Sequence, residues 1–336
     1  MLYSIQFLRF IAAFLVVVNH SSQDFANQTW VLGAAGVDIF FVISGVVITL
    51  STKEGMPAAY FLARRATRIY PFYWLATAFF ILFTWYAWDS FPTWQNLLLS
   101  VFLIPEFGYQ RQPVYFPAWT LYYELLFYIV FGVLLALKVR QVAFTSVLIM
   151  LFLSIAKIPV PFREPGVYFE NNIVLEFAAG VVIALFHQRG LRLSRNLATK
   201  CVMVAVAIFV ITPQPDYSRE LQWGVPAALL VFGFIHFEDK SWLHARLISL
   251  LGDASYAIYL THITIMQFMG EVFAWNGIIL KDYPLFAIPL TIVVPTVVGL
   301  QIHVMIEKPM LLKLRNLTAT VLAGRAQVRT SSLASK

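Results

Sequence analysis

The hydrophobic positions of this chain fall into long apolar runs that short polar segments separate. Ten of these runs are long enough, or nearly long enough, to cross a bilayer as helices. They cover residues 5–20, 33–51, 70–88, 118–137, 142–156, 171–187, 199–213, 222–237, 254–273 and 284–306. Several are short, so we expect tilted or partly re-entrant helices, and the run 96–104 should be interfacial or re-entrant. The pattern predicts an all-α fold, a polytopic membrane bundle of about ten transmembrane helices.

The composition agrees with a membrane protein. Hydrophobic residues make up 60% of the 336 residues and charged residues only 12%, about half the charged share of a soluble domain. The many aromatic residues suit a lipid-facing surface with interfacial belts. The single cysteine, Cys201, excludes an internal disulfide and a cysteine-rich metal site, and we expect no bound metal. No basic segment precedes the first apolar run, so a cleaved signal peptide is not expected.

The basic residues are unevenly divided between alternate loops. The odd-numbered loops hold five Lys and Arg in all, whereas the even-numbered loops and the C-terminal tail hold eighteen. The positive-inside rule then places both termini in the cytoplasm. Because the net charge of +7 is spread over these loops, it does not indicate a nucleic-acid partner.

Every loop is too short to hold a separate soluble domain. We therefore expect one membrane domain over residues 1–316 and a short basic cytoplasmic tail over residues 317–336. The tail is rich in Ser, Thr and Ala. We expect it to be disordered or to lie on the anionic lipids of the inner leaflet.

The first apolar run carries two ionisable groups, Arg9 near its start and His20 at its far end. Eleven residues separate them, so in a helix they share nearly the same face and lie roughly 16 Å apart along the axis. Both side chains can then point into a protein interior, and ionisable groups inside a membrane mark functional sites. The alternative is that Arg9 extends to the headgroups and His20 lies in the far interface.

Carboxylates gather toward the predicted outer side, where His20 also lies. Asp38 and Glu124 fall about 8 and 9 Å below the outer face in their spans, and Glu176 and Glu271 belong to the same outer third. Asp38 can also serve as an acid at a helix N-terminus. Glu124 is surrounded by aromatic and aliphatic residues and needs a partner, which favours a functional role. For Glu176 and Glu271 an interfacial position is the simpler interpretation.

A polar stripe runs along the ninth span. Ser255, Tyr259 and His262 lie on one face of the predicted helix. Hydrogen bonding between helices explains such a stripe as well as chemistry does.

Three arginines stand before the third span, in the predicted cytoplasmic loop. Arg65 and Arg68 are one helical turn apart, so together with Arg64 they can converge on an anion, and a guanidinium fork suits phosphate. The alternative is ordinary positive-inside anchoring.

Several of these stretches together resemble the acyltransferase-3 family of integral membrane acyltransferases. Arg9 and His20 resemble its Arg, ten residues, His signature. The other matching stretches, in family order, are GVDIFFVISG at 36–45, RRATRIYP at 64–71, WTLYYELLFY at 119–128, GDASYAIYLTH at 252–262 and EKP at 307–309. The opening residues and the compact length are similar to those of bacterial exopolysaccharide acetyltransferases of the succinoglycan type.

The resemblance implies an acyltransferase of the bacterial cytoplasmic (inner) membrane. Such an enzyme takes an acyl group, usually acetyl, from cytoplasmic acetyl-CoA. It delivers this group to a hydroxyl of a cell-surface glycan, an exopolysaccharide or a lipid-linked oligosaccharide. Membrane lipids and glycan-assembly proteins are the further partners it implies.

The residues found above fit this chemistry. Arg64, Arg65 and Arg68 are expected to hold the phosphates of the acyl-CoA. His20 is expected to act as the general base, because imidazole titrates near neutral pH, or to carry the acyl group transiently. Asp38 or Glu124 would orient His20 or hold the acceptor. Arg9 would stabilise the donor or a carboxylate. The further candidates are His262, Tyr259 and Trp119.

A transporter or flippase for a glycan or lipid-linked intermediate is the alternative. It would use the outer carboxylates as a relay, but it does not need the paired arginines and His20 together. A membrane sensor or scaffold has no soluble output domain to support it.

Overall fold

A computed structural model describes residues 2–26, 31–104, 113–156, 172–212 and 219–317, and within them the chain is all-helical. The main helices are α1 (Tyr3–Ala26), α2 (Ala35–Ser51), α3 (Ala58–Trp88), α4 (Trp94–Val101), α5 (Trp119–Ala136), α6 (Val142–Ile155), α7 (Val174–Gln188), α8 (Arg195–Ile211), α9 (Val225–Phe234), α10 (Arg246–Trp275) and α11 (Pro284–Ile302). The short helical turns are η1 (Val31–Ala34), η2 (Phe116–Ala118), η3 (Glu220–Gly224), η4 (Ile235–Phe237), η5 (Ser241–His244), η6 (Leu280–Asp282) and η7 (His303–Glu307).

Each of the ten predicted runs overlaps one of these helices, which confirms an all-α fold. Five helical segments are long and apolar enough to cross a membrane, and these are Tyr3–Asp24, Ala58–Trp88, Phe116–Ala136, Glu220–Phe237 and Pro284–Leu317. Helices α2, α6 and α7 are apolar but shorter. The count of ten spans and the cytoplasmic placement of both termini stay predictions, and residues 318–336 of the predicted tail lie outside the described residues.

The third helix begins earlier than its hydropathy indicates. We predicted a span at 70–88 with the arginines in a loop before it, whereas α3 starts at Ala58 and carries Arg65 and Arg68 within its helical body. The reason is that apolar residues continue at helical spacing through the charged stretch, and Phe61 and Ile69 are both buried. The arginines therefore have fixed positions on a helix.

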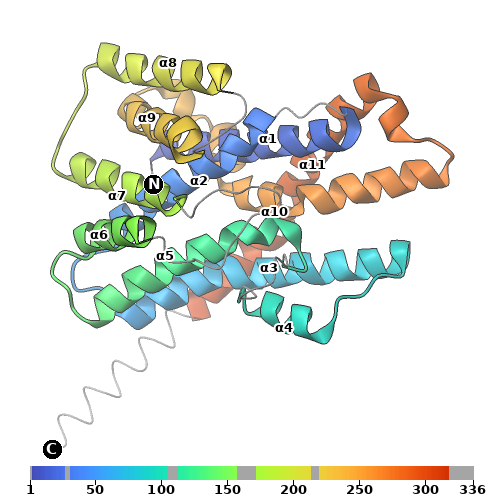
Figure 1. Ribbon diagram of the computed structural model, residues 1–336, viewed down its shortest axis with the longest axis horizontal. Coiled ribbons are helices and arrows are strands. Elements are labelled where there is room, and N and C mark those ends of the chain that lie inside the picture. The colour runs from blue at the N-terminus through green and yellow to red at the C-terminus, as the bar shows by residue number, and fades with distance from the viewer. Residues whose placement is uncertain (1, 27–30, 105–112, 157–171, 213–218, 318–336) are drawn as a thin grey trace, which may run out of the picture.

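The helices around the centre run in two opposite directions (Figure 1). Helices α1, α3 and α10 start at the end that holds Arg64, Arg65 and Arg68, which we call the arginine end. Helices α2, α5 and α11 start toward the end that holds His20 and His262, which we call the histidine end. Two hydrogen bonds show that α1 and α10 run in the same direction. Gln6 bonds to Asp253 at the arginine end, and His20 bonds to His262 at the histidine end.

Helices α1 and α10 approach each other closely at the arginine end. A Cβ atom added at Gly252 would lie 2.4 Å from the backbone oxygen of Gln6, so only glycine permits this packing. Helix α10 then continues well past the histidine end. His262 lies thirteen residues before its last residue, Trp275, which is roughly 20 Å along the axis. Helix α3 follows it outward, and Trp88 donates to Glu271 there at 2.7 Å.

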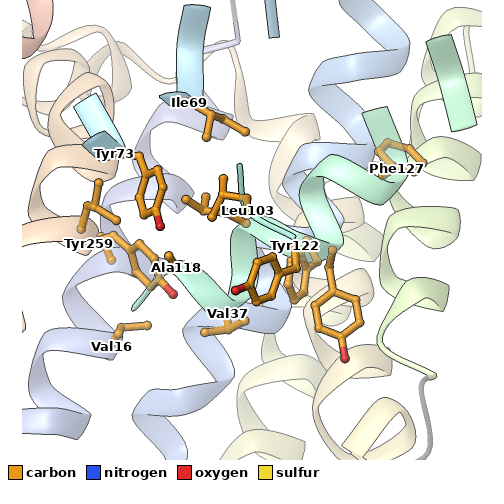
Figure 2. Packing of buried hydrophobic residues seen from close by; sticks show 14 of the residues in the cluster. Val16, Val37, Ile69, Tyr73, Leu103, Ala118, Tyr122, Phe127 and Tyr259 are labelled. Carbon is orange, nitrogen blue, oxygen red and sulfur yellow. The ribbon is translucent and has the colours of Figure 1, made fainter. Parts of the chain in front are cut away.

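The core between the two ends is largely aromatic. Figure 2 shows part of one buried cluster, in which side chains from α1, α2, α3, α5 and α10 meet. Its labelled members are Val16, Val37, Ile69, Tyr73, Leu103, Ala118, Tyr122, Phe127 and Tyr259. Tyr259 is thus packed in the core as well as being a candidate site residue.

The short apolar run that we expected to be interfacial or re-entrant forms α4 and the residues after it. After α3 ends, this segment folds back along that helix. Tyr73 and Trp74 of α3 donate to the backbone oxygens of Ser100 and Val101, each at 2.8 Å. The chain thus returns to the middle of α3, and Trp94 on α4 remains 81% exposed.

Candidate active site

A cavity of about 320 Å³ lies between α1, α2, α3, α5 and α10. One part of its wall is charged and belongs to the arginine end. The rest is mainly apolar and extends toward Tyr259 and Thr120. The apolar wall comes chiefly from α2, and it is formed by Val37, Phe40, Phe41, Ile43, Val47 and Ile48.

Among the residues that the structure describes, five arginines line this cavity, and three of them are the predicted Arg64, Arg65 and Arg68. The other two are Arg9 of α1 and Arg315, which follows α11 and η7. Two carboxylates, Glu124 and Asp253, share the wall with them. Positive groups therefore outnumber negative ones, and guanidinium groups bind phosphate by paired hydrogen bonds. The charged wall suits a ligand with several negative charges.

Aromatic rings hold the two arginines of the predicted pair. Arg65 lies over the rings of Phe61 and Tyr128, at 5.3 and 5.5 Å, and donates to the hydroxyl of Ser51 at 2.6 Å. Arg68 lies over the ring of Tyr256 at 5.5 Å. Such contacts fix a guanidinium while leaving other N–H groups able to bind a ligand.

The C-terminal EKP stretch has a structural link to this cavity. Glu307 is fully buried, and its carboxylate lies 3.7 Å from the guanidinium of Arg68. Its other oxygen lies 2.6 Å from Nδ1 of His303, in a turn of π-helix that continues α11. Glu307 does not line the cavity, but its ion pair with Arg68 supports an arginine that does.

Arg9 points inward, as its helical face predicted, and lines the cavity. Its guanidinium donates to the side-chain oxygen of Gln6 at 3.1 Å. Gln6 in turn donates to Asp253 at 2.5 Å. This chain ties α1 to α10 just where Gly252 lets them approach, so Arg9 has a defined place in the cavity wall.

Glu124 lies with the arginines, whereas the depth estimate grouped it with His20. Tyr128, one turn further along α5, donates a hydrogen bond to Glu124 and also lies under Arg65. The estimate failed because α5 is shifted along its neighbour, so that Phe61 in the first turn of α3 packs against Tyr128 and Phe131. Hydropathy does not report such a shift.

The two histidines meet at the other end. Nε2 of His262, which is fully buried, lies 3.1 Å from Nδ1 of His20. The same nitrogen of His20 lies 3.0 Å from the backbone oxygen of Val16. The ring of Phe116 packs edge-on against His20 at 6.1 Å. His20 therefore faces protein neighbours.

Tyr259 connects the cavity with the histidine pair. Its side chain belongs to a residue of the cavity wall, and its hydroxyl lies 3.0 Å from the hydroxyl of Thr120 and 3.0 Å from the backbone oxygen of Pro117. Its own backbone oxygen accepts from Nδ1 of His262 at 2.5 Å. Neither histidine lines the cavity itself, so Tyr259 marks the boundary between the two.

Asp38 lies in a different cluster. It is fully buried, and Arg219 donates to both of its carboxylate oxygens, at 3.0 and 2.9 Å. The guanidinium of Arg219 also lies over the ring of Trp223 at 5.1 Å. Among the described residues, no hydrogen bond or ion pair joins Asp38 to His20.

Glu176 adjoins this cluster. It is only 2% exposed and interacts with Asp38, so it is buried inside the bundle, whereas its interfacial depth in the membrane stays a prediction.

The remaining candidate, Trp119, starts α5 and packs edge-on against Tyr123 at 6.2 Å, outside the cavity wall. Sequence reasoning missed Arg315, Asp253, Ser51 and Tyr256. Asp253 and Tyr256 belong to the quoted GDASYAIYLTH stretch, which was a usable signal. Arg315 looked like one more basic residue near the end of the chain, and nothing set it apart.

Comparisons with known proteins identify the family of this chain. A family model described as an acyltransferase domain matches residues 2–300. The chain is 34% identical to "Exopolysaccharide production protein ExoZ" of Rhizobium meliloti (strain 1021), over 91% of this chain and 98% of the relative. It is 26% identical to "Acyltransferase MdmB" of Streptomyces mycarofaciens, over 78% of each chain. No solved structure matches significantly. The chain therefore belongs to the acyltransferase-3 family.

Proposed function

We propose that this protein transfers an acetyl group from acetyl-CoA to a hydroxyl of an exopolysaccharide-type glycan, within the bacterial cytoplasmic membrane. The observation that carries the donor assignment is the cavity with five arginines and an apolar extension. The family match and the name of the relative ExoZ support acyl transfer and a polysaccharide acceptor. They favour this function over the transporter that the sequence left open.

The charged wall of the cavity is the place for the donor's phosphates. Coenzyme A carries a pyrophosphate and a ribose phosphate, and several guanidinium groups at fixed positions suit such a polyanion. Arg65 and Arg68 lie on α3, whereas Arg9 and Arg315 come from other parts of the chain. The loop-borne anchoring that we considered would not need arginines from separate elements to face one cavity.

The apolar wall is the place for the pantetheine arm. The cavity volume of about 320 Å³ is near the lower limit of ligand pockets, so it holds part of the donor while the nucleoside stays at the mouth. The arm then extends along α2 toward Tyr259, and the thioester lies next to the histidine pair. With the arginine end in the cytoplasm, as the loop charges predict, the acceptor arrives from the opposite side.

His20 is the base in this proposal. It takes the proton of the acceptor hydroxyl, the hydroxyl oxygen forms a bond to the acyl carbon, and the carbon–sulfur bond breaks. The sulfur leaves as thiolate and takes the proton from His20, so the products are an ester and free coenzyme A. General-base catalysis of this kind contributes roughly 100- to 10,000-fold to the rate.

The test uses the purified full-length protein in lipid nanodiscs with radiolabelled acetyl-CoA. We expect label to pass to an isolated exopolysaccharide repeat or its lipid-linked form, and free coenzyme A to appear in equal amount. Mass spectrometry of the glycan from a deletion strain should show the loss of acetyl groups. An acceptor that crosses the membrane without gaining label, together with an unchanged glycan, would support the transporter instead.

A further inference from the structure

The hydrogen bonds at the histidine end determine which nitrogen of each ring carries a proton. Nδ1 of His262 lies 2.5 Å from the backbone oxygen of Tyr259. A carbonyl oxygen only accepts, so Nδ1 of His262 must be the donor. In the neutral ring, Nε2 of His262 then has no proton and is an acceptor.

The same reasoning extends to His20. Its Nδ1 lies 3.1 Å from Nε2 of His262 and 3.0 Å from the backbone oxygen of Val16. Both of these atoms are acceptors, so Nδ1 of His20 carries the proton and shares it between them. A proton on Nε2 of His262 instead would leave the Val16 oxygen facing a lone pair.

We propose that His262 is a positioning residue for acyl transfer, because it holds His20 in the tautomer that leaves Nε2 of His20 free to take the acceptor's proton. The proposal rests on the proposed function above. Once Nε2 has taken that proton, the charged ring still donates from Nδ1 to His262 and Val16. His262 thus does by a neutral acceptor what a carboxylate does in a serine hydrolase triad.

The surroundings of His262 keep its ring in place. The side chain is fully buried, and its acceptor Tyr259 is itself fixed through the hydroxyl bonds to Thr120 and Pro117. Tyr259, which lines the cavity, is therefore linked to His20 by two hydrogen bonds, one from its backbone oxygen to His262 and one from His262 to His20. This places the supporting residue on α10 and the base on α1.

The first test reads the tautomer directly and does not depend on activity. Nitrogen NMR of the protein in nanodiscs, with isotope-labelled histidine, distinguishes protonated from bare ring nitrogens. A His20→Gln variant assigns the signals of His20 among the six histidines. We expect His20 to carry its proton on Nδ1 in the wild type and to lose this preference in His262→Leu. A wild-type His20 protonated on Nε2 would overturn the proposal.

The second test separates positioning from packing. In His262→Leu we expect kcat to fall roughly 100-fold, with the KM for acetyl-CoA unchanged. His262→Gln offers a side-chain oxygen as acceptor and should recover part of that loss. Thr261→Val is the matched control, because Thr261 is buried on the same helix and its hydroxyl, among the described residues, bonds only to the backbone oxygen of Ala257 in that helix, at 2.8 Å. Its kcat should stay at the wild-type value.

The outcomes remain distinguishable from failure of the proposed function. If the wild type transfers no acyl group, the function fails while the NMR result still decides the tautomer. If His262→Leu does not fold, the wild-type spectrum and the His262→Gln kinetics decide. Equal kcat in the wild type and a folded His262→Leu would show that His262 only fills space.

Discussion

The arginine end and the histidine end of the central bundle differ in how many side chains form each site. At the arginine end, five guanidinium groups from α1, from α3 and from the residues after η7 line one cavity. At the histidine end, one hydrogen bond between two rings joins α1 to α10. In the proposed mechanism, binding of the donor is thus distributed over many groups, whereas proton transfer depends on a single nitrogen. Loss of one group should therefore be tolerated at the first end and not at the second.

The largest effect is expected for His20→Ala. Removing the only general base in the proposal should lower kcat about 1,000-fold, while the KM for acetyl-CoA and the melting temperature stay close to those of the wild type. Steady-state kinetics with radiolabelled acetyl-CoA and a thermal scan in detergent measure these quantities. Activity within tenfold of the wild type would mean that the two ends do not differ in this way.

The next largest effect is expected in the cluster of Asp38 and Arg219. Arg219→Met leaves the buried Asp38 without its bidentate partner, which should destabilise the fold by about 3 kcal/mol. Chemical unfolding in detergent measures this, and kcat per folded molecule should not change. The double variant Asp38→Leu, Arg219→Met is the control and should recover most of the stability. A lower kcat in the folded fraction would show that Asp38 takes part in catalysis together with His20.

A smaller effect is expected for Arg65→Ala. Loss of one charged donor to phosphate should raise the KM for acetyl-CoA about tenfold, near 1.4 kcal/mol, with kcat almost unchanged. Arg65→Lys keeps the charge but loses the fork and the ring contacts, so its KM should be intermediate. An unchanged KM in the alanine variant would indicate that Arg65 does not bind the donor and only contributes to the positive-inside charge of the loop.

The smallest effect is expected for Arg64→Ala. Arg64 lines the cavity but is exposed, over the ring of Tyr60 at 5.6 Å. Water and salt screen exposed charges, so KM should rise only about twofold at low ionic strength and not at all in high salt. An effect as large as that of Arg65→Ala would show that exposure does not rank these arginines.

Helical spacing predicted well those features that lie within one helix. The eleven-residue interval placed Arg9 and His20 on one inward face, and the three-residue interval brought Arg65 and Arg68 to one cavity. Features that depend on how helices are shifted against each other escaped prediction. Glu124 lies with the arginines and not beside His20, where its depth in the span had placed it, because the second half of α5 packs on the start of α3. Arg219, which we had counted as a loop charge, pairs with Asp38 across 181 positions of sequence, and no periodicity reports such a distance.

The outward extension of α3 and α10 limits what the enzyme can modify. The histidine pair lies roughly 20 Å before the last residue of α10, with α3 beside it. In the proposed function, an acceptor that approaches from the histidine end passes these two helices before its hydroxyl meets His20. We expect a single repeat on a lipid carrier to be acylated faster than the finished polymer, and equal rates for the two acceptors would contradict this expectation.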